Sequence, residues 1–138
     1  MFKRATLLVF LFILPFKVWA SYDIENAYPE PELKPNDVVK LQLLAMQQND
    51  DSDFGIEVTF RFASPSNKIQ TGPLKRFIRL VRNPSYRPLL NHINATFLEL
   101  NIEEDFAVQD VIITTSNGER IGYRFRLSIQ KGPLYQGC

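Results

Sequence analysis

The stretch "FGIEVTFRFASPSN" (Phe54–Asn67) decides the fold, because its first half fits two kinds of secondary structure. Its apolar residues Ile56, Val58, Phe60 and Phe62 alternate with polar ones, which is typical of a half-buried strand. Ile56 and Phe60 also lie four residues apart, as do Val58 and Phe62, which suits a helix. A strand would start a sheet-only domain, whereas a helix would join a helical cover over a later sheet. The pattern alone favours the strand slightly.

Helices are predicted on both sides of this stretch. Pro35-Asn36-Asp37 supplies a stop and a cap for a helix that runs to about Gln48. Thr71-Gly72-Pro73 opens another helix with one apolar stripe. Ser64 and Ser66, beside Pro65, are interpreted as helix-ending and turn residues. The remaining face of the later helix is basic, and we interpret it as a solvated face, with anion binding as the alternative; it consists of Lys75, Arg76, Arg79 and Arg82.

From His92 onward the pattern changes to strands. Alternation predicts one strand from His92, a second from Phe106 to Thr115, a third after Gly118 and a short fourth one after Gly132-Pro133. Asn117-Gly118 is a hairpin signal, and a two-residue loop there pairs Ser116 with Glu119. This register pairs Ile112 with Tyr123 and Asp110 with Phe125, and it places Asp110 on the apolar face.

The first twenty residues have the pattern of a signal peptide. A basic head is followed by an apolar run from Ala5 to Phe16 and by Lys17-Val18-Trp19-Ala20, in which small residues are placed as in a cleavage site. The run is too short to span a bilayer, so we expect cleavage after Ala20, no stable membrane insertion after cleavage, and a secreted or periplasmic protein. Residues 21–34 are predicted to be a flexible linker, and residues 35–138 a single domain.

Composition excludes several classes of protein. Without its leader the chain has 13 basic residues against 15 acidic ones, so no basic excess favours a nucleic-acid partner. Cys138 is the sole cysteine, so the chain has no internal disulfide. The sequence has no metal-ligand cluster, nucleophile elbow or phosphate loop, and we expect neither a metal nor a cofactor.

Several segments resemble an uncharacterised family, domain of unknown function 4864. They are "PNDVVKLQLLAMQQNDD", "FRFASPSNKIQTGPLKRFIRLVRNPSYRPLLNH" and "GPLYQGC", and the match as a whole covers about Pro35 to Cys138. The resemblance implies an α+β fold in which N-terminal helices pack on a curved antiparallel sheet, as in nuclear-transport-factor-like, cystatin-like cones. It implies a helix from about Phe54 to Ala63. Members usually continue past the Gly-Cys pair, so the last strand is predicted to be truncated.

The resemblance implies a fold and no activity. Our first hypothesis is a non-catalytic domain that binds a small apolar ligand or a partner chain, with a homodimer as another use of the same surface. The alternative is an isomerase or lyase in which His92 and Asp110 are the catalytic candidates. Since we count only these two titratable candidates, an enzyme is the less favoured hypothesis. The predicted ligand-binding residues are Tyr86, Asp110, Tyr123 and Phe125, and Asn94-Ala95-Thr96 is a glycosylation sequon that has meaning only in a eukaryotic host.

Overall fold

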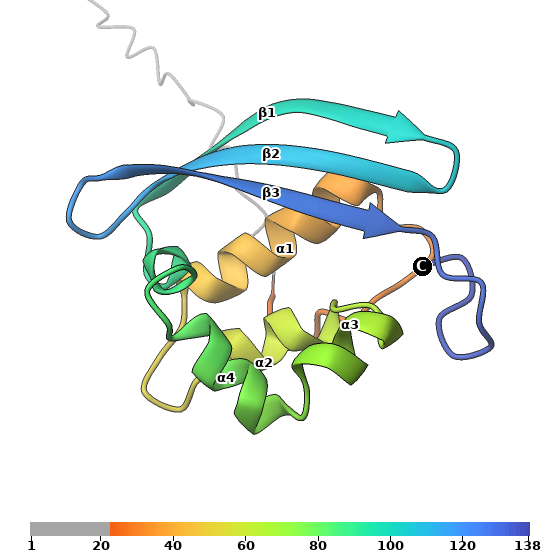
Figure 1. Cartoon of the computed structure of the whole chain (residues 1–138), viewed down its shortest axis with the longest axis horizontal. Helices are drawn as coiled ribbons and strands as arrows, with labels where there is room; N and C mark the ends of the chain where they lie inside the picture. Colours follow the sequence, from red (N-terminus) through yellow and green to blue (C-terminus); the bar gives the residue numbers. More distant parts are fainter. Residues whose placement is uncertain (1–22) are drawn as a thin grey trace, which may run out of the picture.

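A computed structural model describes residues 23–138, which form an α+β domain with all its helices on one side of an antiparallel sheet (Figure 1). Helix α1 lies directly under the sheet, and α2, α3 and α4 form the layer beyond it. The predicted fold class is therefore confirmed, while the more specific cone assignment stays a prediction. The elements are α1 (Pro35–Gln47), α2 (Phe54–Arg61), α3 (Pro65–Thr71), α4 (Leu74–Val81), the 3-10 helix η1 (Arg87–Leu89), β1 (Asn94–Glu103), β2 (Phe106–Thr114) and β3 (Arg120–Ser128).

The ambiguous stretch is helical, as the family resemblance implies. Helix α2 packs between α1 and α4, so two of its sides are covered, and Ile56 and Val58 are both fully buried. Burial on two sides explains why its apolar residues imitate strand alternation. Glu57 lies on the solvent side of α2 and forms an ion pair with Arg61 one helical turn away, with 3.6 Å between Arg61 Nη2 and Glu57 Oε1, while the Arg61 side chain is itself only 17% exposed.

Helix boundaries follow local capping. The Asp37 carboxylate accepts a hydrogen bond from the Lys34 backbone N–H at 3.2 Å at the start of α1, which confirms the predicted first helix. Helix α3 was not predicted. Ser64 does not end a helix but begins α3, because its Oγ accepts from the Asn67 N–H at 3.2 Å and Pro65 occupies the first helical position.

The three strands are arranged in the order β1-β2-β3, and every neighbouring pair is antiparallel. A β-bulge interrupts the β1–β2 register between Phe97 and Leu100. Gln109 lies on the covered face with only 1% of its surface exposed, and its side-chain amide donates to the Leu98 carbonyl at 2.9 Å. A buried amide thus satisfies a carbonyl that the bulge removes from the regular ladder.

The predicted hairpin register is wrong by one residue. Thr115, not Ser116, pairs with Glu119, because the loop contains three residues and Gly118 adopts a left-handed conformation with φ of 89°. The shift pairs Asp110 with Arg124 and places Ile112 opposite Gly122. Asp110 and Ile112 therefore lie on the outer face of the sheet, and Val111 and Ile113 occupy the covered face instead.

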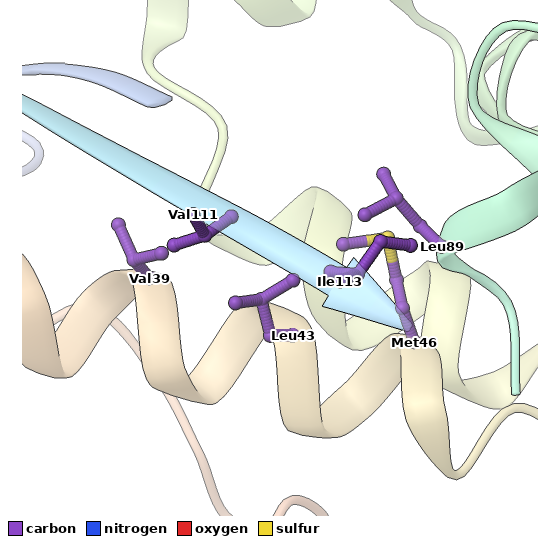
Figure 2. Close-up of a cluster of buried hydrophobic side chains, with 6 residues drawn as sticks. All are labelled: Val39, Leu43, Met46, Leu89, Val111 and Ile113. Carbon is purple, nitrogen blue, oxygen red and sulfur yellow. The ribbon is translucent and has the colours of Figure 1, made fainter. Parts of the chain in front are cut away.

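The main core lies between α1, η1 and β2 (Figure 2). Side chains from α1 and β2 meet there, and Leu89 from η1 closes one end. Partly buried aromatic residues of β1 and β3 extend this core along the sheet. Its six buried members are Val39, Leu43, Met46, Leu89, Val111 and Ile113.

Both ends of the described chain differ from expectation. Residues 23–34 do not behave as a free linker, because Ile24 is 7% exposed and packs with Ala45 and Val58. The expected fourth strand is absent from residues 129–138, which form turns closed by a hydrogen bond from the Gln130 N–H to the Cys138 carbonyl. The predicted signal peptide, residues 1–20, lies outside the described residues.

Candidate ligand-binding cavity

A cavity of about 810 Å³ lies between the covered face of β3, the helices and the C-terminal turns. Three consecutive inward positions of β3, Tyr123, Phe125 and Leu127, form one wall, because alternate side chains of a strand share a face. The other walls are largely apolar and come from all four α-helices and the residues next to them; their apolar members include Val38, Met46, Phe62, Phe77, Leu80 and Val81.

Two polar groups of the cavity wall already have protein partners. The Tyr123 hydroxyl donates to the Ser85 carbonyl at 2.8 Å. Gln42 Nε2 donates to the Thr59 carbonyl at 3.3 Å. Burial raises the pKa of the Tyr123 phenol above its ordinary value, and the neighbouring Tyr86 raises it further. This phenol therefore stays neutral at physiological pH, and the wall near it offers a hydrogen-bonding hydroxyl in apolar surroundings.

Three of the four predicted ligand-binding residues line this cavity, and Asp110 does not. Tyr86, Tyr123 and Phe125 are wall residues. The Asp110 carboxylate instead lies on the outer face of the sheet, where Arg124 binds both of its oxygens at 2.8 Å. This hydrogen-bonded guanidinium holds the pKa of the Asp110 carboxyl below its usual range. The placement of Asp110 on the apolar face was wrong because it depended on the two-residue loop.

His92 and Asp110 are not brought together. His92 is 4% exposed, and its Nδ1 lies 2.7 Å from the Leu89 carbonyl oxygen, so the ring fixes the loop between η1 and β1. His92 lies just before Asn94, which the β1–β2 register places opposite Thr114. Asp110 is four residues from Thr114 along β2, a distance of about 13 Å at 3.3 Å per residue. These two residues form no acid–base pair. Asn94, the sequon residue, is exposed at the start of β1.

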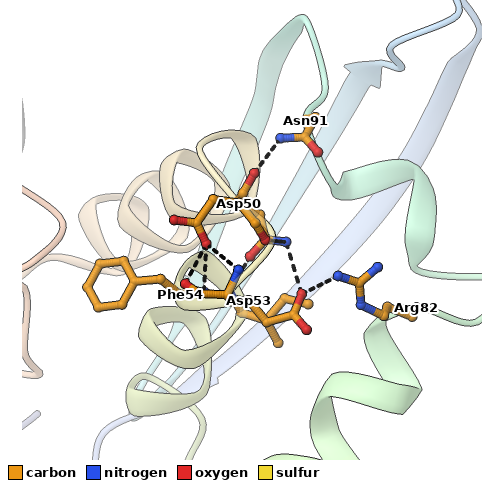
Figure 3. A network of polar contacts seen from close by, with 8 residues as sticks. Asp50, Asp53, Phe54, Arg82 and Asn91 are labelled. Carbon is orange, nitrogen blue, oxygen red and sulfur yellow. Dashed lines mark hydrogen bonds and ion pairs between the residues drawn. The ribbon is translucent and has the colours of Figure 1, made fainter.

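A polar network that was not predicted joins the α1–α2 loop to α4 and to the loop before β1 (Figure 3). Asp53 forms an ion pair with Arg82, and Asn91 Nδ2 donates to the Asn49 carbonyl at 2.8 Å. Ser52 Oγ donates to Asp50 at 2.6 Å and holds the pKa of that carboxyl below its usual value. In this network Asp50 is bonded to Ser52 and Asp53 is paired with Arg82. Residues 23–138 contain no group of three His, Cys, Asp or Glu side chains placed to hold a metal ion.

None of the helices in the described part of the chain has the length and apolar character needed to cross a bilayer.

Comparison with known proteins gives a family and no activity. The search of curated proteins and the search of solved structures each found no significant match. A family model matches residues 30–133, which is most of the chain, and this range contains all four helices, η1 and the three strands. The chain therefore belongs to the family described as "Domain of unknown function (DUF4864)".

Proposed function

We propose that this chain is a non-catalytic, exported domain whose cavity binds a small apolar ligand. The observation that carries the proposal is the cavity of about 810 Å³ with its aromatic and aliphatic walls. Ligand sites in proteins are typically concave, mostly apolar spaces of about 300–1,000 Å³ with a few polar groups, and this cavity has that size and composition.

The chemistry of the wall supports an apolar ligand. Among residues 23–138 no buried side-chain nitrogen or oxygen lacks a hydrogen-bond partner. A strongly polar ligand would have to compete for groups that are already bonded, such as the Tyr123 hydroxyl and the Gln42 amide. An apolar ligand gains from burial of its surface without breaking these bonds.

The alternative, an isomerase or lyase, has no geometric support. General acid–base catalysis requires a base and an orienting partner within hydrogen-bond reach of each other or of the substrate. His92 does not line the cavity and is bonded to the Leu89 backbone carbonyl, and Asp110 is bonded to Arg124 on the opposite face of the sheet. Export rests on the leader pattern of residues 1–20. A homodimer through the uncovered sheet face is a second use of the domain that native mass spectrometry would detect.

The first experiment is native mass spectrometry of protein purified from its own host. We expect a mass increment that corresponds to one small molecule and that disappears on mild activation or organic extraction. Such a molecule that is chemically converted on incubation, with conversion lost in His92→Ala, would overturn the binding proposal.

A second experiment localises binding with an uncharged fluorescent apolar probe, N-phenyl-1-naphthylamine. Leu127→Trp adds bulk at a half-buried position of the cavity wall, and Val108→Trp adds the same bulk at a half-buried position on the outer face of the sheet. We expect saturable one-to-one binding to the unchanged protein and to Val108→Trp, and its loss in Leu127→Trp. Equal binding to both folded variants would show that the cavity is not the site.

A further inference from the structure

Positive charge is concentrated in one continuous segment of the chain. Between Glu57 and Glu99 there is no Asp or Glu, so all 15 acidic residues lie outside residues 58–98. The segment carries seven basic residues: Arg61, Lys68, Lys75, Arg76, Arg79, Arg82 and Arg87. Although the net charge of the domain is close to zero, its positive and negative charges are therefore strongly separated along the chain.

The fold presents much of this charge to solvent along α4. The apolar side of α4 faces inward, where the rings of Phe77 and Phe60 lie 4.8 Å apart between centroids. Lys75, Arg76 and Arg79 are exposed, and within residues 23–138 none of the three has a carboxylate within 4 Å. Because inward packing fixes the rotation of α4, these cations remain on the surface.

Two protruding aliphatic side chains belong to the neighbouring segments. Ile69 on α3 is 83% exposed and Leu134 in the C-terminal turns is 82% exposed, the highest values among the large hydrophobic residues of the described chain. Their segments meet, because Lys68 Nζ lies 5.2 Å from the centre of the Tyr135 ring. We call the surface made by α3, the exposed side of α4 and Leu134 the basic face.

We propose that the basic face adsorbs to an anionic phospholipid bilayer. Unpaired cations would lie at the level of the lipid phosphates, and Ile69 and Leu134 would enter the boundary between headgroups and acyl chains. An acidic protein partner would complement the cations but would need pockets for two isolated, protruding aliphatic side chains. A bilayer accommodates such side chains at any position, which favours it as the occupant. This adsorption differs from the stable insertion that the sequence argues against.

The basic face also borders the cavity. Pro65, Asn67 and Thr71 of α3 line the cavity, as does Tyr135 of the C-terminal turns. An adsorbed domain would hold this side of the cavity near the lipid. The adsorption proposal does not depend on ligand binding, because it rests on charge and exposure alone.

The test is co-sedimentation of the full chain with two kinds of vesicle, pure phosphatidylcholine and phosphatidylcholine with added phosphatidylglycerol. The test variant is Arg76→Gln/Arg79→Gln, and the matched control is Arg120→Gln/Arg126→Gln on the outer face of the sheet. All four arginines are exposed, and both variants lose the same charge. Residues 1–22 are identical in all variants, so a difference in partitioning between two variants comes from the substituted residues.

We expect tighter partitioning to the vesicles that contain phosphatidylglycerol, and we expect added salt to weaken it. Each removed cation should lower the partition constant about fivefold, so the α4 pair should lower it about twenty-five-fold, while the control pair changes it far less. Ile69→Ser/Leu134→Ser should weaken partitioning by about tenfold or more, including at high salt.

Three outcomes would overturn the proposal. The first is equal partitioning to both kinds of vesicle, and the second is an equal loss in the α4 and control pairs. The third is binding to polyglutamate that is at least as tight as binding to vesicles and insensitive to Ile69→Ser/Leu134→Ser, which would assign the basic face to an acidic protein partner.

Discussion

Replacement of Gly55 by alanine separates two physical effects that act in opposite directions. Gly55 lies in the first turn of α2, where this helix crosses the end of α1. A Cβ atom at this position would lie 2.0 Å from the Ala45 carbonyl oxygen and 2.9 Å from the Asn49 Cα. Both neighbours are backbone atoms of the same helical hairpin, so no side-chain rotation can relieve the clash.

The magnitude follows from the two terms. Helix propensity alone would stabilise Gly55→Ala by at most about 1 kcal/mol. Overpacking typically costs about 1–3 kcal/mol, and the 2.0 Å approach places this site at the upper end of that range. We therefore expect a net loss of about 2 kcal/mol in the free energy of unfolding, which lowers Tm by about 8 °C in a domain of this size.

The measurement is chemical and thermal unfolding followed by circular dichroism. Gly132→Ala is the matched control, because a Cβ there meets nothing within 4 Å, and we expect it to be neutral or slightly stabilising. If Gly55→Ala raised the Tm, the close approach of α1 and α2 would be refuted. An equal fall in both variants would show that the loss does not come from this contact.

Three other substitutions test the sheet and the cavity wall. Gln109→Leu should destabilise the domain by about 1–3 kcal/mol in a denaturant titration, although it buries more apolar surface, because the Leu98 carbonyl loses its donor; a stabilised variant would contradict this. Asp110→Asn should reduce stability at neutral pH, and the difference should vanish in acid: the folded pKa is lowered by Arg124, so the ion pair contributes above the unfolded pKa and is lost as pH falls through the folded one. A difference that persists in acid would exclude the ion pair as its cause. Tyr123→Phe should make the free energy of unfolding depend less on pH in the alkaline range. The folded state raises the pKa of the Tyr123 phenol, so in the unchanged protein stability falls as pH rises from the unfolded pKa toward the folded one. An unchanged alkaline slope would show that another group titrates there.

The sequence predicts elements better than it predicts their pairing. A stop and cap signal identified α1, and a proline followed by an apolar stripe identified α4. Periodicity alone favoured a strand for α2, because a short helix buried on two sides loses its single apolar stripe. Helix α3 was missed for the opposite reason: it has no buried residue and Ile69 is its only large apolar side chain, so no stripe marks it. Its signal was the cap, a serine before a proline with an N–H three residues later.

The candidate site depended on register, which short-range signals leave open. Asn-Gly suits a two-residue loop, but glycine at a positive φ suits a three-residue loop as well. The loop is one residue longer than predicted, and this shift of the register places Asp110 on the outer face of the sheet. The inward positions of Tyr123 and Phe125 depend only on alternation within β3, so they were predicted correctly, and both residues line the cavity. The cavity itself arises from the distance between α4 and β3, elements whose packing no local pattern encodes.

The packed segment before α1 affects how the chain can be trimmed by proteases. Arg61 Nη1 donates to the Glu25 carbonyl at 2.9 Å, its guanidinium lies over the Tyr28 ring, and Ile24 is buried beside α2. A protease needs an extended, accessible backbone, and these contacts withhold it from residue 24 onward. An aminopeptidase acting from the N-terminal side should therefore stall near Asp23, so that protein recovered after partial digestion begins at nearly the same residue from one preparation to the next.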